Sequence, residues 1–351
     1  MNAFKKIKSK RTFNAPKDWL KIKTIDMHTG GEPLRVVIDG LPDLIGGSIL
    51  ECRRYMRENY DHLRKTLMFE PRGHADMYGC ILISPNDDSA DFGILFIHNE
   101  GYSTMCGHAI IAITNLAIEM DWVNRVEPET KVLIDAPCGR ITSYARLIHG
   151  KVDSVFFHCV PSFVVALDQE IEVPSLGKIT YDLAYGGAFY AYVNAKEYNI
   201  SLDQNNYSQL IDFGMRIKNA IIESSVPITH PFEEDLSFLY GTIFIGQPTL
   251  KNADSKNVCI FAEGEVDRSP TGSGVSGRMA IHYMRKEIKI GQQMTIESIT
   301  GSVFKGSVVK EVTFGPYQAI MPQVEGNAHI TGKHEFLIDP EDPFKEGFIL
   351  R

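Results

Sequence analysis

The chain has 351 residues, 44% of them hydrophobic and 23% charged, which is the composition of a globular protein long enough for two domains. Its formal net charge of −8 argues against a general nucleic-acid-binding protein, because such proteins present a basic surface to phosphates. No stretch approaches the roughly 18 apolar residues of a membrane helix. We therefore expect neither a nucleic-acid partner nor a membrane-spanning segment.

The six cysteines are scattered, without a C-x-x-C pair or the spacing of a zinc site. This pattern is typical of a reducing compartment, and together with the absence of a secretory leader it predicts a cytoplasmic protein. Most of the cysteines lie in apolar runs and are expected to be buried in the core. Cys106 differs, because Gly107 and His108 follow it at the start of a helical pattern.

The expected elements begin after a basic extension, residues 1–19, which we interpret as solvated. A first α+β half is then expected over residues 20–160. Ser48 and Glu51 form a capping box at the start of a helix that runs to residue 68. The other elements expected here are strands at 20–27, 34–38, 77–84, 92–98, 131–135, 140–147 and 152–160, and a helix at 110–120.

A change of domain is expected in the stretch 161–174, which is punctuated by proline and charged residues. The second α+β half, residues 161–351, repeats the plan loosely. Its expected elements are strands at 181–185, 189–193, 241–245 and 258–261, helices at 202–222 and from about 271 to 285, and short strands from 292 onward. Whether the C-terminal strands pack back on the first half is left open.

Two short stretches share one design, in which a small side chain and a glycine open a helix. They are Cys106-Gly107-His108 and Thr271-Gly272-Ser273. The first N–H groups of a helix have no partner within it, and the helix dipole adds partial positive charge there. If two such ends face each other across a cleft, they can hold one carboxylate between them while two side chains approach the α-carbon from opposite sides.

Cys106 could be a simple helix-capping residue, but its position favours chemistry. A helix N-terminus lowers the pKa of a thiol, His108 is close in sequence, and Gly107 lets a ligand approach the backbone. A thiolate there would serve as a general base. Asp267 is either a loop carboxylate paired with Arg268 or a group that binds a substrate ammonium.

Residues 272–277 match the pattern G-x-G-x-x-G, which is found in dinucleotide-binding proteins. In those proteins the first glycine follows its strand directly, whereas here the charged stretch 263–269 intervenes. The context therefore argues against a nicotinamide cofactor, and no spacing of ligands indicates a metal or flavin.

The motifs also carry a resemblance that covers nearly the whole chain, to the proline racemase family. They are residues 26–33 (Asp-Met-His-Thr-Gly-Gly-Glu-Pro), 71–77 (Pro-Arg-Gly-His-Ala-Asp-Met), 105–108 (Met-Cys-Gly-His), 186–191 (Gly-Gly-Ala-Phe-Tyr-Ala) and 267–274 (Asp-Arg-Ser-Pro-Thr-Gly-Ser-Gly). The resemblance implies a diaminopimelate-epimerase-like α+β fold, with two pseudo-symmetric halves whose central helices point their N-termini at a shared cleft. It also implies a homodimer that uses no cofactor.

Racemases and 4-hydroxyproline epimerases of this family carry two cysteines, whereas this chain has Thr271 at the second position. Racemisation needs an acid and a base that exchange roles, and a threonine hydroxyl has no accessible ionisation near neutral pH. Within the family, a threonine here resembles the enzymes that dehydrate trans-3-hydroxy-L-proline. The resemblance implies that Cys106 removes the α-proton and that Asp267 holds the ring ammonium.

In the same interpretation the amides of Gly107, His108, Gly272 and Ser273 stabilise the carboxylate. The C3 hydroxyl leaves as water, and the enamine tautomerises to Δ1-pyrroline-2-carboxylate. The group that protonates the hydroxyl is left open between Cys106 and an orienting role for Thr271. The alternatives are a 4-hydroxyproline 2-epimerase or proline racemase with another acid, and a catalytically silent amino-acid-binding protein.

Overall fold

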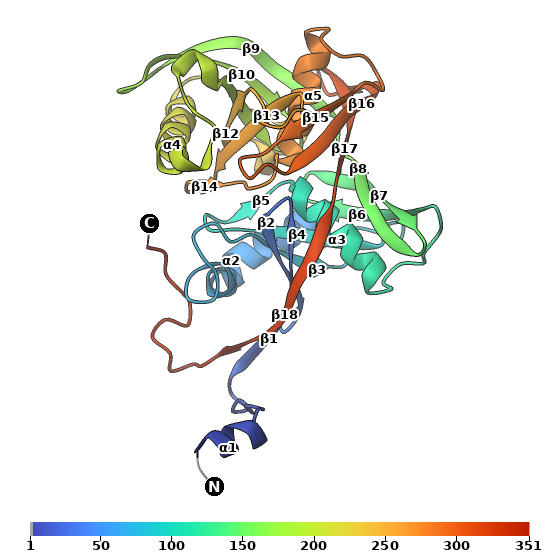
Figure 1. Ribbon diagram of the computed structural model, residues 1–351, viewed down its shortest axis with the longest axis vertical. Coiled ribbons are helices and arrows are strands. Elements are labelled where there is room, and N and C mark those ends of the chain that lie inside the picture. The colour runs from blue at the N-terminus through green and yellow to red at the C-terminus, as the bar shows by residue number, and fades with distance from the viewer. Residues whose placement is uncertain (1–2, 351) are drawn as a thin grey trace.

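The computed structural model describes residues 3–350, whose strands form two closed circuits that each surround one helix (Figure 1). The helices are α1 (Ala3–Ser9), α2 (Ile49–Met68), α3 (Gly107–Glu119), α4 (Tyr207–Glu223) and α5 (Gly272–Met284), with short 3-10 helices η1 (Ala195–Tyr198), η2 (Gln204–Asn206) and η3 (Glu234–Leu236). The strands that come first in the chain are β1 (Leu20–Thr29), β2 (Glu32–Asp39), β3 (Gly79–Ile83), β4 (Phe92–Ile97), β5 (Tyr102–Ser103), β6 (Glu129–Ala136), β7 (Gly139–Ile148) and β8 (Lys151–His158). Those that follow in the chain are β9 (Ser162–Val173), β10 (Gly177–Tyr185), β11 (Phe189–Asn194), β12 (Leu239–Gly246), β13 (Ser255–Phe261), β14 (Glu265–Val266), β15 (Gln293–Glu297), β16 (Val303–Phe314), β17 (Tyr317–Gly326) and β18 (Ala328–Ile338).

The first circuit is closed by the last strand of the chain. Pairing runs from β1 through β2, β3, β4, β6, β7 and β8 to β17. β17 continues into β18, and β18 pairs antiparallel with β1 from Leu20↔Ile338 to Thr29↔Ala328. The C-terminal strand therefore completes the sheet that the first strand begins.

The second circuit shares β17 with the first. From β17 the pairing runs through β9, β10, β11, β12, β13, β15 and β16 and returns to β17. Because both circuits use β17, this strand joins the two bodies that Figure 1 shows one above the other. The chain crosses from one circuit to the other between β8, which ends at His158, and β9, which begins at Ser162.

The two central helices owe their position to their composition. Ile110, Ile111, Ala112 and Ile113 of α3 are fully buried, so this helix is apolar on every side, as expected of a helix enclosed by sheet. It contacts β1, β2, β7, β8, β17 and β18. The first ten residues of α5 are also buried, and α5 contacts β9, β10, β11, β16 and β17.

The outer helices α2 and α4 are amphipathic and cover the circuits from outside. The predicted capping box is present, because the Ser48 hydroxyl accepts a hydrogen bond from the Glu51 N–H at 3.3 Å. The Glu51 carboxylate in turn accepts one from the Gly47 N–H at 2.6 Å. The predicted helix to residue 68 is therefore confirmed, with its apolar stripe on the core.

The stretch 161–174, where a change of domain was predicted, is almost entirely β9, which begins where the chain crosses into the second circuit and pairs with β10 and β17. One detail differs from the sequence-based expectation. The C-terminal strands are not short, because β16, β17 and β18 have 12, 10 and 11 residues. Their irregular alternation reflects register shifts, one of them between Val308 and Lys310, where a bulge moves the side chains to the other face.

The ends of the described chain lie on the outside. α1 has no buried residue and projects below the first circuit in Figure 1, with Phe4 and Ile7 both more than half exposed. The C-terminal segment packs near the end of α2, where Glu70 and Phe348 form a β-bridge. Within residues 3–350, no helix is long and apolar enough to cross a membrane.

Candidate active site

The N-termini of α3 and α5 meet backbone to backbone at two glycines. A Cβ atom added to Gly107 would lie 2.5 Å from the Gly272 Cα, and one added to Gly272 would lie 2.7 Å from the Gly107 Cα. Both distances are shorter than any real contact between carbon atoms, so only glycine fits at either position. The unpaired N–H groups and the positive dipole ends of both helices therefore converge on one place, which suits a carboxylate.

Cys106 is the N-cap residue of α3 and is 5% exposed. Its side chain makes no capping hydrogen bond, and its sulfur lies 3.1 Å from Nδ1 of His108. Burial raises the pKa of this thiol well above its ordinary value, while hydrogen bonds from the Ala109 N–H and the Tyr78 hydroxyl oppose the rise. The expectation of a lowered thiol pKa is therefore wrong for this enclosed state, because desolvation outweighs the helix N-terminus.

His108 is neutral in this environment. Burial lowers the pKa of its imidazole to about 3, although a hydrogen bond to the Pro33 backbone opposes the change. The His108 carbonyl accepts a hydrogen bond from the Thr29 hydroxyl at 2.9 Å, which fixes the first turn of α3 against β1. A neutral imidazole can accept a hydrogen bond from the thiol, but it does not form a Cys–His ion pair here.

Thr271 occupies the same position on α5 that Cys106 occupies on α3. It is the N-cap residue of α5 with φ of 66°, a left-handed conformation that is rare for a β-branched residue. Such a conformation costs on the order of 1–3 kcal/mol and persists only where the surroundings enforce it. The side chain is buried, and its hydroxyl lies near the Asp267 carboxyl, where it opposes the rise in the pKa of that group. The structure therefore holds a buried hydroxyl beside Asp267 at the start of α5.

Asp267 lies just upstream of α5 and is 5% exposed. Burial raises the pKa of its carboxyl to about 6, and hydrogen bonds to Ser269 oppose the rise. The alternative pairing with Arg268 does not occur, since the Arg268 guanidinium binds Asp76 at 2.8 Å instead. The Asp267 carboxylate is therefore available to a cation in the cavity.

All seven residues named from the sequence line one small cavity of about 20 Å³, between the starts of α3 and α5. They are Cys106, Gly107, His108, Asp267, Thr271, Gly272 and Ser273. Five further side chains line it that the sequence reasoning did not assign: Tyr78, Met105, Tyr190, Tyr240 and Phe261. Tyr78 directly follows one resemblance motif and Tyr190 lies within another, whereas nothing in the sequence distinguishes Tyr240.

Residues of the first circuit fix the loop that carries Asp267. The Glu32 carboxylate accepts a hydrogen bond from the Arg268 N–H at 2.7 Å. The Asp76 carboxylate binds the Arg268 guanidinium and accepts a hydrogen bond from the Val266 N–H at 3.2 Å. Asp76 of the first circuit therefore holds the loop before α5 in place. Within residues 3–350, no group of three or more His, Cys, Asp or Glu side chains could hold a metal ion.

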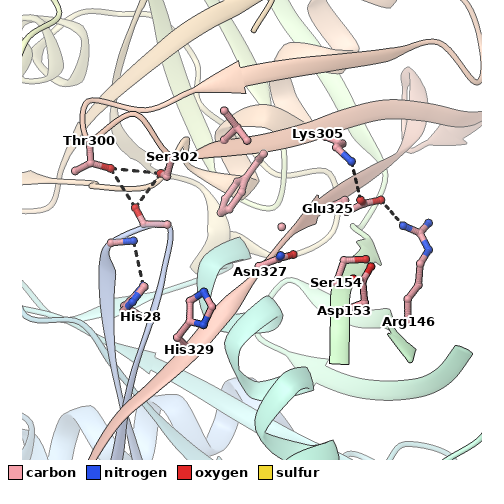
Figure 2. A pocket seen from close by; sticks show the side chains of 15 residues that line it. His28, Arg146, Asp153, Ser154, Thr300, Ser302, Lys305, Glu325, Asn327 and His329 are labelled. Carbon is pink, nitrogen blue, oxygen red and sulfur yellow. Dashed lines mark hydrogen bonds and ion pairs between the residues drawn. The ribbon is translucent and has the colours of Figure 1, made fainter. Parts of the chain in front are cut away.

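A larger hollow of about 660 Å³ opens between the β1–β2 turn, β16 and β17 (Figure 2). Its charged groups pair with one another, since Glu325 binds both Lys305 at 3.1 Å and Arg146 at 2.5 Å. The rings of His28 and His329 lie on its wall with centroids 5.2 Å apart. No cysteine lines it, so the small cavity is the better candidate for chemistry at an α-carbon.

Two joined strand circuits with a thiol and a hydroxyl at facing helix N-termini define a diaminopimelate-epimerase-like enzyme. Solved structures with this fold include a phenazine biosynthesis protein of the PhzF family from Bacillus anthracis, with a TM-score of 0.58 and 10% identity over 91% of this chain and 99% of that one. The proline racemase family model matches residues 24–349. The chain therefore belongs to the proline racemase family.

Several relatives resemble the chain over most of its length. It is 50% identical to the trans-3-hydroxy-L-proline dehydratase of Colwellia psychrerythraea, over 95% of this chain and 94% of that protein. It is 46% identical to the trans-L-3-hydroxyproline dehydratase of Xenopus tropicalis, over 96% and 97% of the two chains. A crystal structure of a hydroxyproline epimerase from Agrobacterium vitis, with bound trans-4-hydroxy-L-proline, has a TM-score of 0.88 and 29% identity over 94% of this chain and 96% of that one.

Proposed function

We propose that this protein is a cofactor-independent hydro-lyase that dehydrates trans-3-hydroxy-L-proline to Δ1-pyrroline-2-carboxylate and water. The observation that carries the proposal is the pair of facing side chains, a thiol at Cys106 and a hydroxyl at Thr271. One side offers a group that can ionise, and the other offers a group that cannot. Relatives that are 43–50% identical over most of the chain and are named for this dehydration support it.

Substrate binding is assigned to the helix ends and to Asp267. The amides of Gly107, His108, Gly272 and Ser273 hold the carboxylate, where the dipoles of α3 and α5 favour negative charge. Asp267 holds the ring ammonium through a charge-assisted hydrogen bond. The same amides stabilise the charge that grows on the carboxylate when the α-proton leaves.

Proton removal is assigned to Cys106. Burial keeps this thiol protonated in the small cavity, but the ring ammonium is a positive charge beside it, and a nearby positive charge favours the thiolate. The substrate therefore helps to activate its own base. The pair of electrons left at C2 forms the C2=C3 bond, the C3 hydroxyl departs, and the enamine tautomerises to the imine.

An epimerase is the second candidate function, and one relative favours it. A protein of Burkholderia multivorans, 44% identical over 94% of this chain and 98% of its own length, is named 3-hydroxyproline 2-epimerase. Epimerisation needs a proton donor on the Thr271 side of the α-carbon, which would have to be a group other than Thr271.

The test is incubation with trans-3-hydroxy-L-proline, trans-4-hydroxy-L-proline and L-proline in deuterated water, while imine formation and inversion at C2 are followed together. We expect imine from the 3-hydroxy substrate and no inversion of the other two. Inversion without imine would establish the epimerase instead. Deuterium at C2 of none of the three, with no imine, would leave only an amino-acid-binding protein.

The partner of this protein is accordingly a small molecule, and we propose that the protein acts as a homodimer in the cytoplasm. The six buried cysteines with free thiols support a reducing compartment. The homodimer rests on the family resemblance alone. Measurement of the molar mass in solution tests it.

A further inference from the structure

The geometry of the substrate decides where the leaving hydroxyl must find its proton, and this inference rests on the proposed function. In trans-3-hydroxy-L-proline the C3 hydroxyl and the C2 carboxylate lie on opposite faces of the ring. The C3 hydroxyl and the C2 hydrogen therefore lie on the same face. A base that removes the C2 hydrogen of this substrate works on the face from which the hydroxyl leaves.

Because Cys106 is the base, the proton donor must also stand on the Cys106 side of the cavity. Thr271 caps the opposing helix α5 and approaches from the other face. His108 lies on the correct side, but its imidazole is neutral, with a pKa of about 3, and it hydrogen-bonds to the Pro33 backbone. Neither residue is therefore suited to deliver a proton to the departing oxygen.

Tyr78 lies on the correct side and lines the cavity. Its hydroxyl lies close enough to the Cys106 sulfur to oppose the rise in the pKa of that thiol, and its ring packs edge-on against His108 with centroids 4.8 Å apart. The Tyr78 carbonyl accepts a hydrogen bond from the Arg35 N–H at 2.9 Å, which holds the residue at the start of β3. The phenol therefore has a fixed position beside the base.

A second phenol supports the first. The hydroxyl oxygens of Tyr78 and Tyr240 are 3.4 Å apart, and both tyrosines line the cavity. Burial raises the pKa of both phenols well above the ordinary value, and hydrogen bonds to Ser103 oppose the rise. Tyr78 consequently remains protonated near neutral pH and can act as a donor.

We propose that Tyr78 is the catalytic acid that protonates the departing C3 hydroxyl, with Tyr240 as its positioning partner. The Cys106 thiolate takes the C2 proton, and the electron pair of the C2–H bond forms the C2=C3 bond. The C3–O bond breaks with its electron pair, the oxygen takes the proton of the Tyr78 hydroxyl, and water is formed. The Cys106 thiol then returns its proton to the Tyr78 oxygen, so both residues end as they began.

The acidities are in the required order. A phenol in water has a pKa of about 10, and water is a far weaker acid. Proton transfer from Tyr78 to a departing hydroxide is therefore favourable, although burial raises the pKa of the phenol. Return of a proton from the thiol to a tyrosinate is favourable as well, because burial raises the pKa of both groups and a phenol is intrinsically a weaker acid than a thiol.

The experiment compares two leaving groups in the Tyr78→Phe variant. One substrate is trans-3-hydroxy-L-proline, and the other is trans-3-fluoro-L-proline, whose fluoride departs as a stable anion without a proton. We expect dehydration to fall about 100-fold or more, the usual contribution of a general acid. Release of fluoride should fall by less than about tenfold, because only the hydroxyl requires the acid.

Two results with the variant would overturn the proposal. Dehydration that stays close to the wild-type rate would mean that Cys106 itself returns the proton to the hydroxyl. An equal fall for both substrates would mean that Tyr78 acts on the thiol or on packing. A wild-type protein that dehydrates the hydroxy substrate but releases no fluoride would also contradict it, because the carbanion step would then fail to expel a good leaving group.

Tyr190→Phe is the matched control. Its hydroxyl lies in the same cavity but hydrogen-bonds to the Ser273 hydroxyl of α5 at 2.7 Å, away from the thiol. The ratio of hydroxide to fluoride elimination should therefore keep its wild-type value in this variant. Thermal unfolding of both variants checks the fold. Failure of the proposed function is a separate result, because the wild-type protein would then form no imine from the hydroxy substrate.

Discussion

The N-termini of α3 and α5 both present a glycine to the cavity, but their cap residues differ in side chain and in backbone conformation. Each helix opens with a glycine that no other residue could replace, and each has an N-cap side chain without a capping hydrogen bond. Cys106 has an ordinary extended backbone, with φ of −143°, and neighbours that contact its sulfur. Thr271 has φ of 66°. The backbone thus provides an anion site twice, while the side chains provide only one group that can ionise.

The largest effect is expected for Cys106→Ser, which removes the only ionisable cap side chain of the two helices. A serine hydroxyl keeps the shape but does not ionise near neutral pH, so imine formation should fall about 10³-fold or more. Cys52→Ser is the control, because Cys52 lies on α2 outside the cavity. Full turnover by Cys106→Ser would refute the assignment of the base.

Gly107→Ala tests whether the contact between the two helices matters. The new methyl group would lie 2.5 Å from the Gly272 Cα, so the helices must separate, and a misplacement of this kind costs about 100-fold in rate. The melting temperature should fall as well, since overpacking costs about 1–3 kcal/mol. Gly101→Ala is the control, because no atom lies within 4 Å of its added Cβ. Equal behaviour of the two variants would argue against the close approach.

The pH dependence follows from Asp267, whose pKa is raised to about 6 by burial. Its carboxylate binds the ring ammonium only when ionised, so kcat/KM should fall about tenfold for each pH unit below 6. The folded state holds this proton more tightly than the unfolded chain, whose ordinary pKa is 3.8. Wild-type protein should therefore lose stability relative to Asp267→Asn as the pH rises from 3.8 to 6. Denaturant titrations between pH 3.8 and 6 measure the free energy of unfolding of both proteins. The same pH dependence in both would contradict the raised pKa of Asp267.

Thr271→Cys should produce the smallest effect, a slow new activity. A thiol at the start of α5 could donate a proton to the second face of the α-carbon, so L-proline or trans-4-hydroxy-L-proline should begin to invert at C2. Chiral chromatography after long incubation detects this gain, and Thr271→Ser serves as the control. If Thr271→Cys gives no inversion, the identity of residue 271 does not limit chemistry on that face.

The sequence predicted the two helix starts and the seven cavity residues because their motifs are local. A small side chain and a glycine before an apolar helix can be identified within a few residues, as at Cys106 and Gly107. Tyr240 could not be found in this way, since it is 162 residues from Tyr78 in the chain and meets it only where the two circuits come together. The raised pKa of Cys106 was equally inaccessible, because it depends on enclosure by both circuits.

The sequence allowed the α+β class of the fold to be predicted, but not the strand pairings that close the two circuits. Alternation and capping indicated most strands and the helix α2, but they did not indicate that the stretch 161–174 is occupied by the strand β9. Proline at its two ends and charged residues within it resemble a linker, whereas its pairing with β10 and β17 is non-local. Local preference cannot report a partner that lies about 150 residues away along β17.

The pairing of β18 with β1 has a consequence for synthesis of the chain. During synthesis, β1 finds one of its neighbours only when residues 328–338 have been made. Until then α3 lacks β17 and β18, two of the strands that cover it, and its apolar surface is incompletely enclosed. Cys106 consequently depends on a segment that is translated long after it, and termination before β18 should leave even the first circuit without its finished core.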